Sequence, residues 1–174
     1  MSEAQTQVEQ PTEEIHELTV EERTERGNAI VQRYTLGAIL PGLIPLPVVD
    51  LAALSALQLG LLAHLAKVYE VKFQHNVGKS LLSALIGGGV SMGAAPGLAS
   101  LVKLIPGVGT VAGGISVATL GAATTYAVGK VFQMHFEAGG NFLNFDPEKM
   151  RAYFAEQVEE GKQVVSDMQN KHSS

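Results

Sequence analysis

The sequence predicts an all-α protein: a helical bundle with a Gly-rich, hydrophobic helical hairpin of transmembrane type and amphipathic helices at the N- and C-terminal ends. Three observations predict this class. Residues 81–102 and 104–129 carry no charged side chain, and Lys103 alone separates them. Glycines recur at four-residue spacing within this stretch. Both ends of the chain are polar and acidic, with eight acidic and two basic side chains in residues 1–27 and six acidic and four basic in residues 146–174.

The composition bounds the domain organisation and excludes several classes of site. A chain of 174 residues is long enough for one domain with a sizeable core. It contains no Cys, so it has neither a disulfide framework nor a thiolate metal site, and its five histidines show no close metal-ligand spacing. No segment is basic enough to suggest a nucleic-acid partner. We expect a disordered acidic tail over residues 1–18, one helical domain over 19–168 and a flexible tail over 169–174.

The first helix is predicted over residues 20–39. Thr19 and Glu22 form a capping box, in which each side chain bonds the backbone amide of the other residue. The helix ends before residues 41–47, because three prolines in seven residues cannot continue it. The first apolar run begins near Leu36, behind an acidic segment. A secretory signal has the reverse order, so we expect the chain to begin in the cytoplasm.

The second helix is predicted over residues 51–73, with Asp50 as its N-cap. It is apolar nearly all round until Lys67, with Gln58 and His64 as its polar exceptions. A helix that is apolar on every face is buried, either in protein or in lipid.

The hydrophobic hairpin is predicted over about residues 80–130. Roughly 20 apolar residues span a bilayer as a helix, and residues 105–109 (Ile-Pro-Gly-Val-Gly) mark a turn between two such helices. Pro96 and Gly97 predict a kink or an early end in the first of them. A last, amphipathic helix opens at Asp146 as N-cap and Pro147 at the first helical position. Its apolar stripe consists of Met150, Tyr153, Phe154, Val158 and Val165.

The glycines of the hairpin predict a close helix-packing face. Four-residue spacing places positions on one side of a helix. In lipid, small residues there let helices approach closely, within the chain or between copies in a homo-oligomer. The alternative is a tightly packed soluble hairpin. The predicted packing or oligomer face consists of Gly89, Gly93, Gly97, Gly109, Gly113, Gly121 and Gly129.

Residues 76–80 (Asn-Val-Gly-Lys-Ser) look like the end of a phosphate-binding loop, but the rest of the motif is missing. The loop needs an earlier glycine where this chain has Phe73, and a GTPase also needs a base-reading N-K-x-D motif. We therefore read Asn76 and Gly78 as a turn and Lys79 as marking the membrane–water boundary. We expect no catalytic, cofactor-binding or metal-binding residues and no enzymatic activity.

Charged residues near the hairpin suggest its orientation. Lys67, Lys72, Lys79 and Lys130 flank the apolar block on one side, whereas Lys103 lies at the predicted tip. The positive-inside rule then places both termini in the cytoplasm, with the hairpin in the inner (cytoplasmic) membrane. Ionisable or polar residues inside a membrane are costly and often functional. The candidates of this kind are Asp50, His64 and Lys103.

Four stretches together resemble a known family. They are residues 44–54 (Ile-Pro-Leu-Pro-Val-Val-Asp-Leu-Ala-Ala-Leu) with Gln58, residues 76–80, residues 105–109, and residues 125–132 (Thr-Tyr-Ala-Val-Gly-Lys-Val-Phe) continuing to 136–140 (Phe-Glu-Ala-Gly-Gly). In this respect the chain is similar to the bacterial DUF697 family, the YcjF-like, GTPase-associated domain, over roughly residues 20–160. The resemblance implies a helical domain that enters membranes and is often fused behind a GTPase domain, which this sequence does not contain. It implies no catalytic residues.

These observations support three hypotheses. The first is a membrane-associated or integral helical protein without catalytic activity, acting as an oligomeric membrane scaffold or as a GTPase-associated module. The second is a soluble all-helical adaptor that binds a separate GTPase. The third is an oligomeric pore or channel formed by the Gly-rich helices.

Overall fold

The fold is all-α, as the sequence predicts. The structure is a computed structural model, and it describes residues 18–39, 47–91 and 117–172. These ranges form a bundle of five helices and contain no strand. The helices are α1 (Val20–Ile39), α2 (Pro47–Val68), α3 (His75–Ser91), α5 (Val117–Glu137) and α6 (Pro147–His172).

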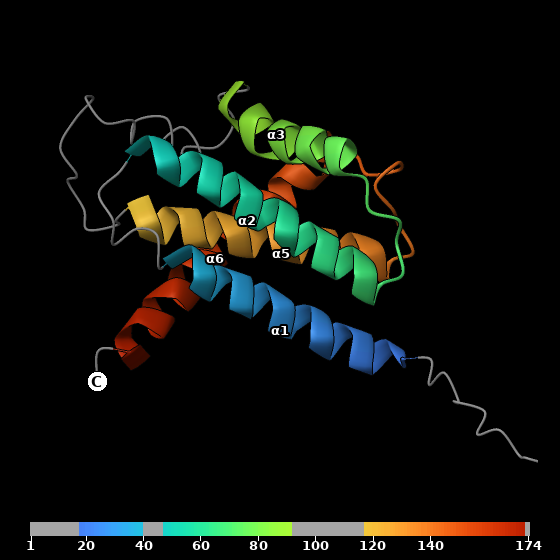
Figure 1. Ribbon diagram of the computed structural model, residues 1–174, viewed down its shortest axis with the longest axis horizontal. Helices are drawn as coiled ribbons and strands as arrows, with labels where there is room; N and C mark the ends of the chain where they lie inside the picture. Colours follow the sequence, from blue (N-terminus) through green and yellow to red (C-terminus); the bar gives the residue numbers. More distant parts are fainter. Residues whose placement is uncertain (1–17, 40–46, 92–116, 173–174) are drawn as a thin grey trace, which may run out of the picture.

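Helix α5 lies at the centre of the bundle. α1 and α2 lie on either side of it with nearly parallel axes, and α6 crosses behind it (Figure 1). α3 packs on α6 and on α2. The end of α1, the start of α2, the end of α3 and the start of α5 all point toward one end of the bundle, which we call the Pro47 end (Figure 1). The opposite end carries the α2–α3 and α5–α6 connections, and we call it the Tyr69 end.

The enclosure of α5 corrects the transmembrane interpretation of its sequence. Ala122, Ala123, Ala127 and Val128 have no exposed surface, because α1, α2 and α6 surround them. An apolar helix is buried either in lipid or in protein, and sequence periodicity does not distinguish the two. Among the described residues, no helix combines the length and hydropathy needed to cross a bilayer. The predicted hairpin turn at residues 105–109 and the kink at Pro96 lie outside the described residues.

Two predicted helix starts are confirmed. The Thr19 backbone N–H donates to Glu22 Oε2 at 2.8 Å, and the Glu22 N–H donates to Thr19 Oγ1 at 3.2 Å, which is the reciprocal capping box. At the start of α6, Asp146 Oδ1 accepts bonds from the backbone amides of Glu148 and Lys149 at 3.1 and 3.4 Å. The Lys149 amide, with that of Glu148, holds the pKa of the Asp146 carboxyl below its ordinary value.

Other boundary predictions are wrong. α2 runs from Pro47 to Val68 and not over 51–73, so Asp50 is its fourth residue and not its N-cap. Proline suits this position because the first helical residues have no intrahelical partner for their N–H groups. Asn76 and Gly78 do not form a reverse turn between helices, because both lie in the first helical turn of α3. α6 extends through His172, so the predicted tail is helical over residues 169–172.

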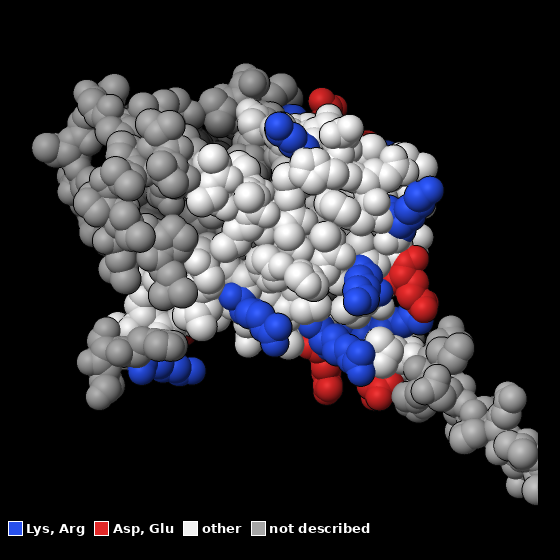
Figure 2. Space-filling model, in the orientation of Figure 1, with Lys and Arg blue, Asp and Glu red and all other residues white. Residues whose placement is uncertain are grey.

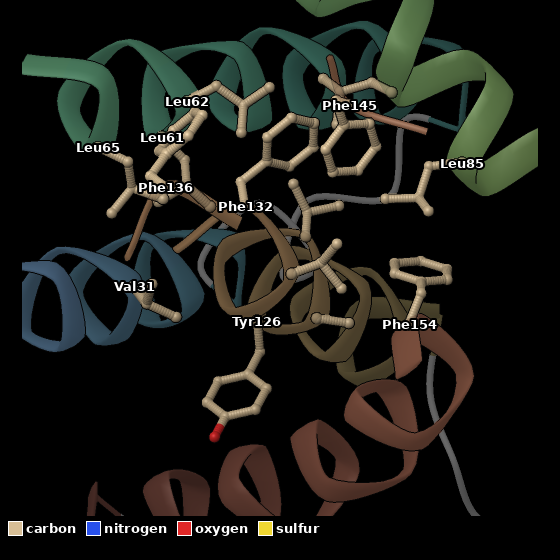
Figure 3. Close-up of a cluster of buried hydrophobic side chains, with 14 of the residues drawn as sticks. Val31, Leu61, Leu62, Leu65, Leu85, Tyr126, Phe132, Phe136, Phe145 and Phe154 are labelled. Carbon is tan, nitrogen blue, oxygen red and sulfur yellow. The ribbon is translucent and has the colours of Figure 1, made fainter. Parts of the chain in front are cut away.

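An aromatic cluster fills the core toward the Tyr69 end. Phe132 of α5 is fully buried and stacks on Phe145, with ring centroids 4.2 Å apart and planes inclined by 6°. Phe136 meets Phe142 edge to face at 5.2 Å. Leu61, Leu62 and Leu65 of α2 close the cluster from above (Figure 3). Fully burying one such side chain contributes about 1.5–3 kcal/mol, so this cluster holds the α5–α6 connection against the bundle.

Glycines shape the connection itself. Gly139 has a φ of 82°, and α5 ends there in a Schellman motif. The Gly139 N–H donates to the Phe136 carbonyl and the Gly140 N–H to the His135 carbonyl, both at 2.9 Å. A Cβ on Gly140 would collide with the His135 ring. His135 Nε2 in turn lies 3.0 Å from both Asn141 O and Asn144 Oδ1, which fixes the loop that leads to α6.

Candidate functional site

The two predicted packing glycines for which the structure gives contacts face other helices of the same chain. A Cβ on Gly129 would lie 2.7 Å from Val31 Cγ2 of α1, and one on Gly121 would lie 3.3 Å from Leu54 Cδ2 of α2. Close approach within the bundle therefore accounts for both. Gly89 lies in α3, and the remaining four predicted positions, Gly93, Gly97, Gly109 and Gly113, lie outside the described residues.

Of the three predicted polar residues, only His64 has its side-chain surroundings described. His64 is exposed on α2, and its Nδ1 lies within hydrogen-bonding distance of the Tyr34 hydroxyl of α1 and 3.1 Å from Gly60 O. Asp50 lies in the first turn of α2, and the position of its side chain is not described. Lys103 lies outside the described residues. Gln58, the other polar exception in α2, is 3% exposed and donates to Thr125 Oγ1 of α5 at 3.4 Å, so it links two helices.

A pocket of about 300 Å³ opens at the Tyr69 end. The Tyr69 hydroxyl donates to Glu137 Oε1 at 2.7 Å, and Gln133 Nε2 donates to the same oxygen at 3.0 Å. Burial first, and then the hydrogen bond to Glu137 and the charge of that carboxylate, raise the pKa of Tyr69 far above its ordinary value of 10.0. The lining residues are Val20, Arg23, Tyr69, Val71, Phe136, Glu137, Gly139 and Gly140.

The residue after Tyr69 adopts an uncommon backbone conformation beside this pocket. Glu70 has a φ of 56°, the left-handed region that disfavours side chains with a Cβ. It ends α2 in a Schellman motif, in which the Val71 N–H donates to the Ala66 carbonyl at 2.8 Å. The Glu70 carboxylate accepts a bond from the Arg23 guanidinium at 2.9 Å. This ion pair ties the end of α2 to the start of α1.

The outer surface of α2 and α3 has an unusual charge pattern. It is largely uncharged, with Lys and Arg side chains over α3, at the end of α2 and beyond it (Figure 2). Only three basic residues occur between positions 47 and 91, namely Lys67, Lys72 and Lys79, and all three are exposed. We call this surface, with its three lysines, the lysine face. None of the ion pairs found among the described residues involves them.

Small uncharged residues lie on the same sides of α2 and α3 as Lys67 and Lys79. Ala53 and Ala56 lie on α2 at helical spacing from Lys67, and Ser83 follows Lys79 by four residues on α3. All are exposed. The one acidic side chain described in this part of the chain, Glu70, is neutralised by Arg23. The lysine face therefore presents a positive charge without large apolar side chains.

Among the described residues, no group of three or more His, Asp or Glu side chains could hold a metal ion. Sequence reasoning missed the Tyr69 pocket, because its polar residues come from α1, α2 and α5 and share no short motif. The lysines were identified from the sequence, but their gathering on one outer surface depends on how α3 packs.

Comparisons with known proteins identify the family. The family model described as a domain of unknown function, DUF697, matches residues 6–163. The chain is similar to "Magnetosome membrane protein 22" of Magnetospirillum gryphiswaldense, with 39% identity over 138 residues that cover 79% of this chain and 71% of the relative. No solved structure gives a significant match. The match over residues 6–163, together with this relative, shows that the chain belongs to the DUF697 family.

Proposed function

We propose that the protein is a non-catalytic, membrane-associated helical module that stands on the cytoplasmic side of a bacterial membrane. The observation that carries the proposal is its 39% identity to a protein named for a membrane. Two features of this chain support it. Residues 40–46 and 92–116 contain a single charged side chain, Lys103, and the helix ends that flank both segments lie at the Pro47 end (Figure 1).

The enclosed core decides which part of the chain contacts lipid in this proposal. α5 is surrounded by protein, so the folded bundle stays outside the hydrocarbon region. Residues 40–46 and 92–116, which carry no charge apart from Lys103, supply the attachment in this proposal. Burial of apolar residues contributes about 25 cal/mol for each Å² removed from water. Self-association remains part of the proposal. It is assigned to the predicted glycines other than Gly121 and Gly129, whose neighbours are in the same chain.

Fractionation of cells tests the proposal. Full-length tagged protein should sediment with membranes and should resist extraction by alkaline carbonate. Replacing Leu43 and Ile44 by Asp, at the Pro47 end, should release it, because a charged residue is costly to bury in lipid. The matched control places Asp at Ala152 and Ser166, exposed positions on α6. Quantitative recovery of the unmodified chain in the detergent-free supernatant would contradict the proposal.

A second candidate function is the docking of a separate GTPase, which is favoured by the position of the Tyr69 pocket. The resemblance to this family implies that the domain is often fused behind a GTPase domain, which would then precede α1. Val20, the first residue of α1, lines the pocket and is 78% exposed. A partner that replaces the fused domain would meet this surface. Pull-down with unmodified protein and with a Val20→Asp variant tests it, and equal recovery of a GTPase with both would count against the pocket.

A further inference from the structure

We infer that the lysine face is a second membrane contact, which binds the anionic headgroups of the bilayer and lays the bundle flat on its surface. This inference rests on the proposed membrane association and specifies the orientation. Its occupant is a lipid surface with negative charge. The observation that carries it is three exposed lysines, Lys67 at the end of α2, Lys72 in the α2–α3 connection and Lys79 on α3. The outer surface over these elements is otherwise largely uncharged (Figure 2).

Charge complementarity selects a negatively charged partner. The three lysines are exposed and take part in none of the ion pairs among the described residues. α6 carries both signs of charge, with Glu148, Glu156, Glu159, Glu160 and Asp167 against Lys149, Arg151, Lys162 and Lys171. The described part of α2, α3 and their connection carries the three lysines against one acidic side chain, Glu70, which is paired with Arg23. A bilayer with anionic lipids therefore attracts the lysine face more strongly than it attracts α6.

The shape of the surface favours a bilayer over a protein partner. The exposed side chains described on α2, α3 and their connection are Lys, Glu, His, Gln, Asn, Ser, Ala and Gly, so this surface offers no exposed Trp, Tyr, Arg or large apolar anchor. Protein interfaces gain most of their affinity from such anchors. Headgroup binding needs none, because it depends on lysine charge within a Debye length of the lipid phosphates. A protein partner is therefore an outcome of the test and not the proposal.

The lysine face and the Pro47 end act together in this arrangement. α2 begins at the Pro47 end and reaches Lys67 in its last turn, so one helix connects the apolar attachment with the first lysine. Stable binding at a membrane surface usually takes two signals, one apolar and one basic. With both engaged, α2 and α3 lie along the membrane, and α6 faces the cytoplasm.

Vesicle flotation tests the contribution of charge. Full-length protein is synthesised in the presence of vesicles of phosphatidylcholine, with or without phosphatidylglycerol. Each lysine near an anionic surface raises the partition coefficient about fivefold, so the three together give a preference of roughly 100-fold for the anionic vesicles. The variant Lys67→Gln/Lys72→Gln/Lys79→Gln should lose this preference. The control changes three lysines of α6, Lys149→Gln/Lys162→Gln/Lys171→Gln, and should keep it at equal net charge.

A second readout reports orientation and does not depend on affinity. The chain contains no Cys, so single substitutions can carry an environment-sensitive dye. Dyes at Ala56→Cys and Ser83→Cys should be shielded from an aqueous quencher on anionic vesicles, whereas a dye at Ser166→Cys on α6 should stay accessible. Circular dichroism verifies that each variant is folded.

The outcomes separate the inference from the proposed function. Equal attachment to both kinds of vesicle, or equal loss of preference in the two triple variants, would overturn the lysine face and leave membrane association intact. Equal quenching at Ser83→Cys and Ser166→Cys would overturn it as well. Capture of a protein by the lysine face in the absence of lipid, abolished by the triple variant, would overturn the lipid assignment. Failure to attach to any vesicle would overturn the proposed function itself.

Discussion

Replacing Gly161 by Ala should destabilise the bundle, because α5 and α6 are in backbone contact there. A Cβ at this position would lie 2.8 Å from Ala123 O, 3.1 Å from Ala123 Cα and 3.1 Å from Tyr126 Cδ1. Ala123 is fully buried and its backbone belongs to the central helix, so the clash cannot be relieved by rotating a side chain. The two helices must move apart along the contact that also places the Tyr126 hydroxyl 2.9 Å from Glu160 Oε1. Tyr126 points from α5 toward α6 at this contact (Figure 3).

The size of the effect follows from two opposing contributions. Overpacking a well-packed contact costs about 1–3 kcal/mol, and replacing glycine by alanine inside a helix returns about 1 kcal/mol. The net loss is about 0–2 kcal/mol. For a chain of this size, 1 kcal/mol changes Tm by about 2–4 °C. Gly161→Ala should therefore lower Tm by up to about 8 °C.

Thermal unfolding followed by circular dichroism measures this change, with Gly87→Ala as the matched control. Gly87 lies in α3, is exposed and has no heavy atom within 4 Å of a Cβ. It undergoes the same chemical change without the clash, so its Tm should rise by about 1–4 °C. If Gly161→Ala also raised Tm, the close approach of α5 and α6 would be refuted.

Three further predictions concern the contacts of α1 with α2 and α5. Gly129→Ala should lower Tm by up to about 8 °C, because its Cβ would meet Val31 Cγ2 at 2.7 Å, and the loss should not change with protein concentration, as it would at an interface between copies. Glu70→Gly should leave Tm nearly unchanged, because relief of about 1 kcal/mol of left-handed strain offsets an exposed ion pair worth about 0–1 kcal/mol; Glu70→Ala, which keeps the strain, should lower Tm. Tyr69→Phe should cost about 1 kcal/mol in urea unfolding at neutral pH. The pKa of Tyr69 is raised in the folded state. The stability that Tyr69 contributes is therefore complete below its ordinary pKa of 10.0 and is lost as the pH rises from there toward the folded-state pKa. The difference in unfolding free energy between wild type and Tyr69→Phe should shrink above pH 10.0.

Local signals in the sequence predicted the helices better than their surroundings. The capping box of Thr19 and the N-cap Asp146 define their helix starts through contacts over two or three residues, and both are confirmed. Asp50 carried the same kind of signal, but α2 begins three residues earlier, at Pro47, because proline also fits the first turn of a helix. Such competition between nearby starts is decided by packing of the whole helix.

The remaining features depend on contacts that are distant in sequence. The apolar pattern of α5 fits burial in lipid as well as in protein, and only the positions of α1, α2 and α6 distinguish the two. Tyr69 meets Glu137 across 68 positions, and no spacing rule predicts that pair. The left-handed Glu70 has no sequence signal either, since glycine is the usual residue at such a helix end.

The direction of α1 has a consequence for proteins that join this bundle to another domain. α1 runs from the Tyr69 end to the Pro47 end and contains 20 residues, so it is about 30 Å long. A domain connected directly ahead of Val20 would lie about 30 Å from the Pro47 end, where α1 ends and α2 begins. The helix then serves as a rigid spacer, and its length sets the working distance between such a domain and the point of attachment.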